Sequence, residues 1–294
     1  MSEGSHFLKS GASFVWCMLH GRLGNNLFQY AAAATLARRG KILLDYSKTG
    51  MALTRRKIAQ EDFHRLGLPG IVVPPLLNRI VHRVTGRHLY QLGILPRMGD
   101  AEWVESDTHQ RKSVMLEGYF QQASTAEHAP EGFRDDLLER LGKVAGHRAI
   151  KPEKGTVAVH VRRGDYLPHD SRMVCGQEYF LEAMRRLRKL GGPFRFLVFS
   201  DDPAWCMEHL AGPDVDLAPP ELEKDAIAAL HGMALCDHQI ISNSTFSWWA
   251  AWLNPNPKKI VVGPDRWDTS GTNSVESKRF SAYHTLAELA ESLP

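Results

Sequence analysis

The chain has 294 residues, of which 43% are hydrophobic and 23% charged, as in an ordinary globular protein. Its formal charge of +3 at pH 7 is too small to indicate a nucleic-acid partner, and no apolar run reaches the roughly 20 residues that a membrane span needs. The N-terminal residues lack a secretory-signal pattern, and the four cysteines form no CxxC pair. We therefore expect a cytoplasmic protein without a zinc site or a disulfide framework.

The first part of the chain has the pattern of a βαβ unit. Residues 13–19 form a continuous apolar run that is typical of a buried parallel strand. The turn HGRLGNN, a helix over residues 27–39 and a second strand over 41–46 follow. Another strand is expected at 114–120, but the remainder of 50–150 shows no regular alternation.

Basic residues gather at 55–57 and 79–88. A solvated surface is the simplest interpretation of these clusters. The alternative is a peripheral contact with a glycolipid or with the inner face of a membrane.

Strands and helices alternate regularly from residue 156 onward. The predicted strands are 156–163, 194–200, 238–242 and 258–263, and the predicted helices are 177–190, 203–210, 222–236, 244–253 and 280–292. Such alternation specifies a parallel sheet covered on both faces. We predict an α/β fold of two Rossmann-like domains facing a cleft, at 13–150 and 151–275, with a tail helix in 276–294.

The motif HVRRGDY (160–166) ends a predicted buried strand. His160 and Arg162 alternate along that strand and should share a face. Arg162 and Arg163 together could chelate a phosphate, because the guanidinium fork matches its oxygens, and Asp165 could hold one of them. A structural Arg–Asp pair is the alternative. An adhesion role for the RGD tripeptide is disfavoured, because the tripeptide directly follows a buried strand.

Three further motifs follow predicted strands. In NSTFSWWAAWL (243–253) a capped helix start offers backbone amides, and the hydroxyls of Ser244, Thr245 and Ser247, to an anion. The tryptophans there are interpreted as core anchors. In HGRLGNN, Gly24 and Asn25 could approach a ligand, although the GxGxxG fingerprint is absent. In FSDDPAW, Asp202 before Pro203 is interpreted as a helix N-cap in preference to a metal ligand.

Together and in this order, these motifs resemble the α-1,2-fucosyltransferase family of bacterial and animal enzymes. The resemblance covers nearly the whole chain. It is carried by GRLGNNLFQYA (21–31), EGYFQ (117–121), HVRRGDY, FSDDPAW and NSTFSWWAAWL. It implies a GT-B-type fold and an inverting transfer of L-fucose from GDP-fucose to the 2-hydroxyl of a terminal galactose in a glycan. It also implies that no metal or other cofactor is needed, GDP-fucose being a co-substrate.

The resemblance also implies a role for each domain and for particular residues. The C-terminal domain would bind GDP-fucose, and the N-terminal domain would shape the site of a galactoside-terminated oligosaccharide. The implied catalytic residues are Arg162, Asn25 and Arg163. The implied donor-binding residues are His160, Arg162, Arg163, Asp165, Gly24, Asn25, Ser244, Thr245, Phe246 and Ser247.

The sequence departs from the family pattern in three places. Asn26 stands where the family usually has glutamine, and His20 and Arg22 stand where it usually has small residues. Ala229 replaces a frequent aspartate, so that guanine is recognised either by Asp225 or by no acid. The natural acceptor and the oligomeric state are not indicated.

The leaving group sets the mechanism that the resemblance implies. Charge developing on the β-phosphate would be stabilised by Arg162, Arg163 and the amides that follow residue 243, while the sugar carbon gains oxocarbenium character. His20, Asp165 and Glu117 are the candidates for a base, but Asn25 could instead position the acceptor without a strong base. A non-catalytic nucleotide-sugar or glycan-binding protein, and transfer to another kind of acceptor, are the alternative functions.

Overall fold

The structure is a computed structural model, and it describes residues 12–37, 40–46, 61–74, 95–105, 113–164, 166–167, 174–271 and 273–291. The basic clusters at 55–57 and 79–88 lie outside these residues. The chain divides into two compact units, Met1–Phe133 and Arg134–Pro294. The division falls before the expected boundary at residue 150, because helix α7 (Phe133–Ala145) packs within the second unit: Arg134 donates to the carbonyl of Asn254, and Gly142 lies against His231.

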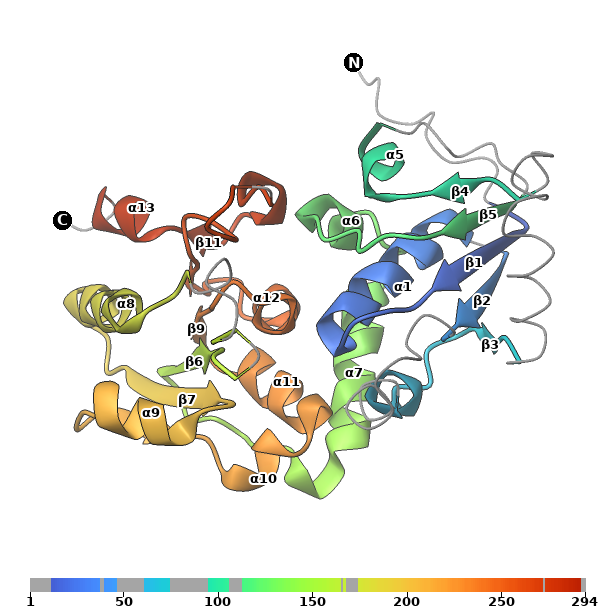
Figure 1. The fold of residues 1–294 in the computed structure, drawn as a ribbon. Helices are drawn as coiled ribbons and strands as arrows, with labels where there is room; N and C mark the ends of the chain where they lie inside the picture. The colour runs from blue at the N-terminus through green and yellow to red at the C-terminus, as the bar shows by residue number, and fades with distance from the viewer. Residues whose placement is uncertain are drawn as a thin grey trace, which may run out of the picture. The chain divides into compact units, whose positions relative to one another are not determined.

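The first unit contains a parallel sheet with the strand order β3-β2-β1-β5-β4 (Figure 1). Its elements are β1 (Phe14–Met18), α1 (Leu23–Ala37), β2 (Lys41–Asp45), β3 (Ile71–Val72), β4 (Arg97–Met98), α5 (Asp100–Glu105), β5 (Ser113–Leu116) and α6 (Ala123–Glu127). Strand β1 pairs in parallel with β2, and α1 packs against both strands and beside α6. The predicted βαβ unit is therefore confirmed.

Helix α1 begins four residues earlier than the sequence predicts. The amide of Asn26 donates to the carbonyl of Arg22 at 3.0 Å, so the turn is already helical there. Gly24 and Asn25 consequently lie in the first turn of α1 and not in a loop before it. The amides of a helix's first turn have no partner within the helix, which leaves this turn suited to an anion or a polar ligand.

The second unit contains a parallel sheet with the strand order β11-β10-β9-β6-β7-β8. After α7 its elements are η3 (Gly146–Arg148), β6 (Thr156–Val161), α8 (Gln177–Lys189), β7 (Arg195–Ser200), α9 (Pro203–His209), β8 (Val215–Leu217), α10 (Pro220–Glu223), α11 (Ala226–Ala234), β9 (His238–Ile240), α12 (Thr245–Leu253), β10 (Val261–Val262), η5 (Glu276–Lys278), β11 (Tyr283–His284) and α13 (Leu286–Glu291). All pairings recorded in this sheet are parallel, as the alternation predicts.

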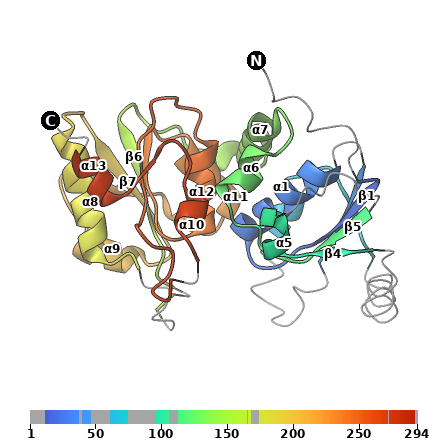
Figure 2. The same ribbon diagram turned by 90° about the horizontal axis from the view of Figure 1, so that it is seen from above.

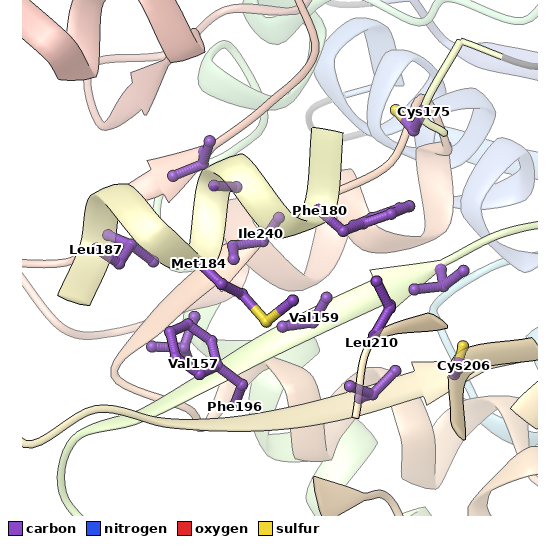
Figure 3. Packing of buried hydrophobic residues seen from close by; sticks show 14 of the residues in the cluster. Val157, Val159, Cys175, Phe180, Met184, Leu187, Phe196, Cys206, Leu210 and Ile240 are labelled. Atoms are coloured by element: carbon purple, nitrogen blue, oxygen red, sulfur yellow. The ribbon is translucent and has the colours of Figure 1, made fainter. Parts of the chain in front are cut away.

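Helices cover both faces of the second sheet (Figure 2). Helices α8, α9 and α13 lie on one face, and α10, α11 and α12 lie on the other. On the first face, Val157 and Val159 of β6 pack with Phe180 and Met184 of α8 and with Phe196 of β7 (Figure 3). Because side chains alternate along a strand, Ala158 and His160 must face α11 and α12.

Two predicted helices are wrong in extent. The helix predicted at 222–236 is split into α10 and α11, because the Asp225 side chain caps α11 by accepting from the amides of Ile227 and Ala228. The helix predicted at 280–292 is shortened to α13. Its first part forms β11, in which Tyr283 pairs with Val261 and donates its hydroxyl to the carbonyl of Pro264.

The four cysteines, Cys17, Cys175, Cys206 and Cys236, are buried free thiols. Across the ranges that the structure describes, every helix is too short or too polar to span a bilayer.

Candidate active site

The carboxyl end of β6 carries the first cluster of candidate residues. His160 is the last residue of β6 on the face opposite Val159 and Val161; it is 6% exposed, and its Nδ1 lies 3.0 Å from the hydroxyl of Ser242. Its ring also contacts Phe246 of α12, with centroids 5.6 Å apart. His160 therefore lies on the face of the sheet that α12 covers, as the strand alternation predicts.

Arg162 continues toward the same side. Its Nη1 lies 2.6 Å from Oδ2 of Asp201, and its guanidinium carbon lies 5.9 Å from the centroid of the Tyr166 ring. The Tyr166 hydroxyl in turn donates to the carbonyl of Asn243, directly before α12, at 3.0 Å. Tyr166 thus connects Arg162 to the turn that precedes α12.

Arg163 belongs to the opposite side, where α9 packs. Its Nε donates to Asp202 at 3.0 Å, and its guanidinium carbon lies 4.0 Å from the centroid of the Trp205 ring. Trp205 itself stacks on His209. A guanidinium held at one edge by a carboxylate and across one face by an indole has little freedom to turn, so the side chain of Arg163 is firmly fixed.

The two aspartates after β7 organise this strand end. Asp202 caps α9 by accepting from the amide of Trp205 at 3.2 Å, with Pro203 at the start of the helix, which confirms the predicted cap. Asp201 accepts from the amide of Arg163 at 2.9 Å besides pairing with Arg162. A Cβ on Gly164 would lie only 2.9 Å from the Asp201 carboxylate, so this approach requires glycine.

Helix α12 starts at the predicted Ser/Thr turn. The Ser244 hydroxyl accepts from the amide of Phe246 at 3.4 Å, and Thr245 and Phe246 form the half-buried first turn. The amides of that turn and the helix dipole favour an anion. Ser247 is 0% exposed and donates its hydroxyl proton to the carbonyl of Ser244 at 3.3 Å, within the first turn of α12.

The tryptophans of α12 are core residues, as the sequence predicts. Trp248 and Trp249 are 0% exposed, and the indole of Trp248 donates to the carbonyl of Lys278 at 2.7 Å. Their rings and that of Trp252 pack edge to face or stacked. They anchor the helix and hold its first turn in place.

Burial dominates the electrostatics of His160. Burial lowers the pKa of the imidazole to about 4. The nearby Asp201 carboxylate raises this pKa, but by less than burial lowers it. His160 is therefore neutral at pH 7 and offers one ring nitrogen as a donor and the other as an acceptor.

The second cluster lies in the first unit, where β1 and β5 end side by side. Asn25 accepts from Nε2 of Gln121 at 3.0 Å. Gly21 has a φ of +85°, and a Cβ there would lie 2.3 Å from Nδ2 of Asn25. Glycine at this position therefore permits both the backbone turn and the approach of the Asn25 side chain.

Gln29 is the buried centre of this second cluster. Its amide contacts the backbone amide and the ring of His20, each at 3.1 Å, and the carbonyl of Gly118 at 3.1 Å. The side chain of Asn26 adds a contact to Gln29 at 3.2 Å. The ring of His20 stands perpendicular to that of Tyr119, with centroids 4.4 Å apart.

The remaining candidates are placed differently. Asp165 lies outside the described residues. Glu117 pairs with Arg97 at 3.3 Å. Asp225 is 4% exposed; it accepts two amides of α11 and pairs with Arg148 at 2.9 Å, so both of its oxygens have structural partners. Within the described ranges, no group of three or more His, Cys, Asp or Glu side chains could hold a metal ion.

Sequence reasoning missed four residues of the two clusters. Ser242, Asp201, Trp205 and Gln29 were given no site role, although each contacts a candidate residue. Gln29 follows Asn25 by one helical turn, a spacing that could have indicated a shared face. The contacts of the other three depend on neighbouring strands or helices and leave no such signal.

Comparison with known proteins gives a consistent result. The model of Glycosyl transferase family 11 matches residues 105–283. The O-antigen biosynthesis glycosyltransferase WbnK of Escherichia coli is 31% identical, over 88% of this chain and 97% of its own length. Galactoside alpha-(1,2)-fucosyltransferase 1 of Oryctolagus cuniculus is 28% identical over 79% of this chain, which spans 62% of that protein.

The solved structures add a likeness of fold. The fucosyltransferase NodZ from Bradyrhizobium superposes with a TM-score of 0.50 at 14% identity, over 84% of this chain and 95% of NodZ. An identity this low is informative about the fold alone. The structural likeness confirms the predicted α/β fold of the GT-B type.

Proposed function

Since this chain belongs to glycosyl transferase family 11, we propose that it moves L-fucose from GDP-fucose to the 2-hydroxyl of a terminal galactose in a glycan, with inversion at the transferred carbon. The similarity to Galactoside alpha-(1,2)-fucosyltransferase 1 supports the galactoside acceptor and the linkage. The family resemblance of the motifs supports GDP-fucose as the donor.

The observation that carries the proposal is the connection of Arg162, through Tyr166, to the turn that precedes α12. Tyr166 contacts the Arg162 guanidinium and donates to Asn243, so a strand-end cation and a helix N-terminus lie on one side of one sheet. Such a pair suits a pyrophosphate, which needs both charge and amide donors. Ligands of parallel α/β sheets bind at this carboxyl edge.

The chemistry follows from this arrangement. As GDP departs, negative charge grows on its β-phosphate, and Arg162 together with the first-turn amides of α12 would stabilise it. This stabilisation needs no metal, and metal independence is part of the proposal. Neutral His160 would donate to, or accept from, the guanosine side of the donor.

The first unit would handle the acceptor. Asn25 and its neighbours lie where β1 and β5 end, which is also the edge at which an α/β sheet receives a ligand. We propose that Asn25 contacts the reacting sugar or the attacking hydroxyl. A peripheral contact with a glycolipid or membrane surface stays a prediction.

A transfer assay with defined acceptors tests the proposal. The purified chain is incubated with GDP-fucose and with lactose, N-acetyllactosamine or the type-1 disaccharide, and the product linkage is determined by NMR. We expect an α-1,2-fucosylated galactose, unchanged yield after EDTA, and no product from the matching 2-deoxygalactoside. Fucose on another hydroxyl would refute the proposed linkage. Complete loss of transfer activity with EDTA, restored by manganese or magnesium, would refute the proposed metal independence.

A further inference from the structure

The turn over residues 117–121, which carries the motif EGYFQ, follows β5 and lies beside the end of β4. The two strands pair in parallel, and the amide of Glu117 donates to the carbonyl of Met98, the last residue of β4, at 3.0 Å. Asp100, two residues beyond Met98, therefore reaches this turn. A Cβ on Gly118 would lie 2.9 Å from the Asp100 carboxylate and 3.0 Å from the Asp100 backbone nitrogen, so this approach requires glycine.

The carboxylate of Asp100 binds two consecutive amides of the turn. The amide of Tyr119 lies 3.0 and 3.1 Å from its two oxygens, and the amide of Phe120 donates to Oδ1. Hydrogen bonds to a carboxylate are stronger than hydrogen bonds between neutral groups. Asp100 therefore fixes the backbone of the turn at both residues.

Phe120 adopts an unfavourable backbone conformation in this turn. Its φ is +54°, and among the residues that the structure describes it is the only one besides glycine with a positive φ. Such a conformation is disfavoured for a residue with a Cβ, so the surrounding contacts must hold it. The Phe120 ring is 1% exposed and packs edge to face on Trp103, with centroids 5.6 Å apart, and the Phe120 carbonyl accepts from the amide of Gln122 at 2.9 Å. Asp100 completes this set of contacts at the amide.

Gln121 comes directly after this left-handed residue and contacts helix α1. Its Nε2 donates to Oδ1 of Asn25 at 3.0 Å, which joins two parts of the chain 96 residues apart. The oxygen of the Asn25 amide therefore faces Gln121, while its Nδ2 faces Gly21, where a Cβ would lie 2.3 Å away. Gln121 thus holds the Asn25 amide in one orientation.

We propose that Asp100 and Gln121 are positioning residues for the transfer. The carboxylate of Asp100 holds the turn in its left-handed conformation, and Gln121, placed by that turn, orients the amide of Asn25. This role rests on the proposed function for what Asn25 contacts, which is the reacting sugar or the attacking hydroxyl. A displacement of about 1 Å in a group that contacts the reactants can cost about 100-fold in rate, so the effect on turnover is measurable.

The positioning role is tested by kinetics beside calorimetry of GDP binding. Asp100→Asn keeps one acceptor oxygen but sets an NH₂ group against the second amide of the turn, and should lower kcat about 10-fold while GDP affinity stays within about twofold. Gln121→Glu keeps the length of the side chain but cannot donate to Asn25, and should lower kcat similarly. Glu102→Gln is the matched control and should leave kcat unchanged, because this carboxylate of the same helix accepts from the amide of Gly99.

A double-mutant cycle tests the route through Asn25. In a chain that already carries Asn25→Ala, the kcat loss caused by Asp100→Asn should shrink to less than about twofold, because the orientation of an absent amide no longer matters. The loss caused by Gln121→Glu should shrink in the same way. Losses as large as those in the wild-type background would show that Asp100 is merely structural and would overturn the positioning role. Gln121→Glu leaves the bonds from Asp100 in place, so it carries the test if denaturant unfolding shows that Asp100→Asn does not fold.

The outcomes separate this inference from the proposed function. A wild-type chain that transfers no fucose to any galactoside refutes the proposed function. A wild-type chain that does transfer, with a kcat that Asp100→Asn and Gln121→Glu leave unchanged, refutes the positioning role alone.

Discussion

The guanidinium carbon of Arg163 lies 4.0 Å from the centroid of the Trp205 ring, on the α9 side of the second sheet. Its neighbour Arg162 pairs with Asp201 on the side of α12. Two arginines that are adjacent in sequence and were expected to act together on a phosphate are thus held on opposite sides. The helix N-terminus suited to an anion lies on the side of Arg162.

The first prediction separates the two arginines. Arg162→Ala should lower turnover by about 100-fold or more, because it removes an electrostatic donor to the leaving group. Arg163→Ala should lower turnover less and lower the free energy of unfolding by about 1–2 kcal/mol, because it removes a stacked and paired side chain. Steady-state kinetics and denaturant unfolding measure both effects, and Arg185→Ala on the exposed face of α8 is the control. Equal turnover losses with unchanged stability would contradict the separation.

The second prediction concerns acid stability. The pKa of His160 falls from its ordinary 6.5 to about 4 on folding, because the ring is buried. Between pH 6.5 and 4 the unfolded chain therefore binds one more proton than the folded chain, and the free energy of unfolding falls as pH falls. The contribution is about 3 kcal/mol over this window. Denaturant unfolding at several pH values should show a flatter dependence for His160→Gln than for wild type, and parallel curves would contradict the assignment.

The third prediction separates turnover from nucleotide binding. Asn25→Ala should reduce kcat more than it weakens GDP binding, because an interaction made mainly in the transition state lowers kcat without changing ground-state affinity. Thr245→Ala should instead weaken GDP binding, because Thr245 lies in the first turn of α12. Calorimetry of GDP binding beside steady-state kinetics distinguishes the two variants. Loss of GDP binding in Asn25→Ala, with Thr245→Ala unaffected, would move the nucleotide to the first unit.

The fourth prediction treats Asp225 as a structural residue. Asp225→Ala removes the cap of α11 and the pair with Arg148, and should lower the free energy of unfolding by about 2 kcal/mol. Asp225→Asn keeps a capping oxygen and should lower the free energy of unfolding by a smaller amount. Neither variant should change GDP affinity by more than about twofold. A tenfold loss of GDP affinity without a loss of ADP affinity would show that Asp225 recognises guanine.

Much of the fold could be predicted from local patterns. A buried parallel strand leaves a clear signal, a continuous apolar run, and such runs predicted β1, β6 and β7. An amphipathic run predicted α8. Glycine or a strand-end motif bounds each of these runs. The cap at Asp202 was also predictable, because Asp before Pro is a local arrangement. The failed prediction of a helix over 280–292 involves tertiary pairing: Tyr283 pairs with Val261 across the sheet, which a helical pattern in the sequence does not reveal.

The sequence by itself determined which residues gather at the strand ends, because motif order and strand alternation are properties of the chain. It placed His160 and Arg162 on one face and put Asn25 beside a glycine turn. Only the tertiary structure decided what each side chain does there. Whether Arg163 stacks on Trp205, and how the amide of Gln29 is oriented, depends on partners many residues away in the chain, such as Gly118, whose carbonyl accepts from Gln29. Such contacts arise when separate strands and helices pack together, and no local pattern encodes them.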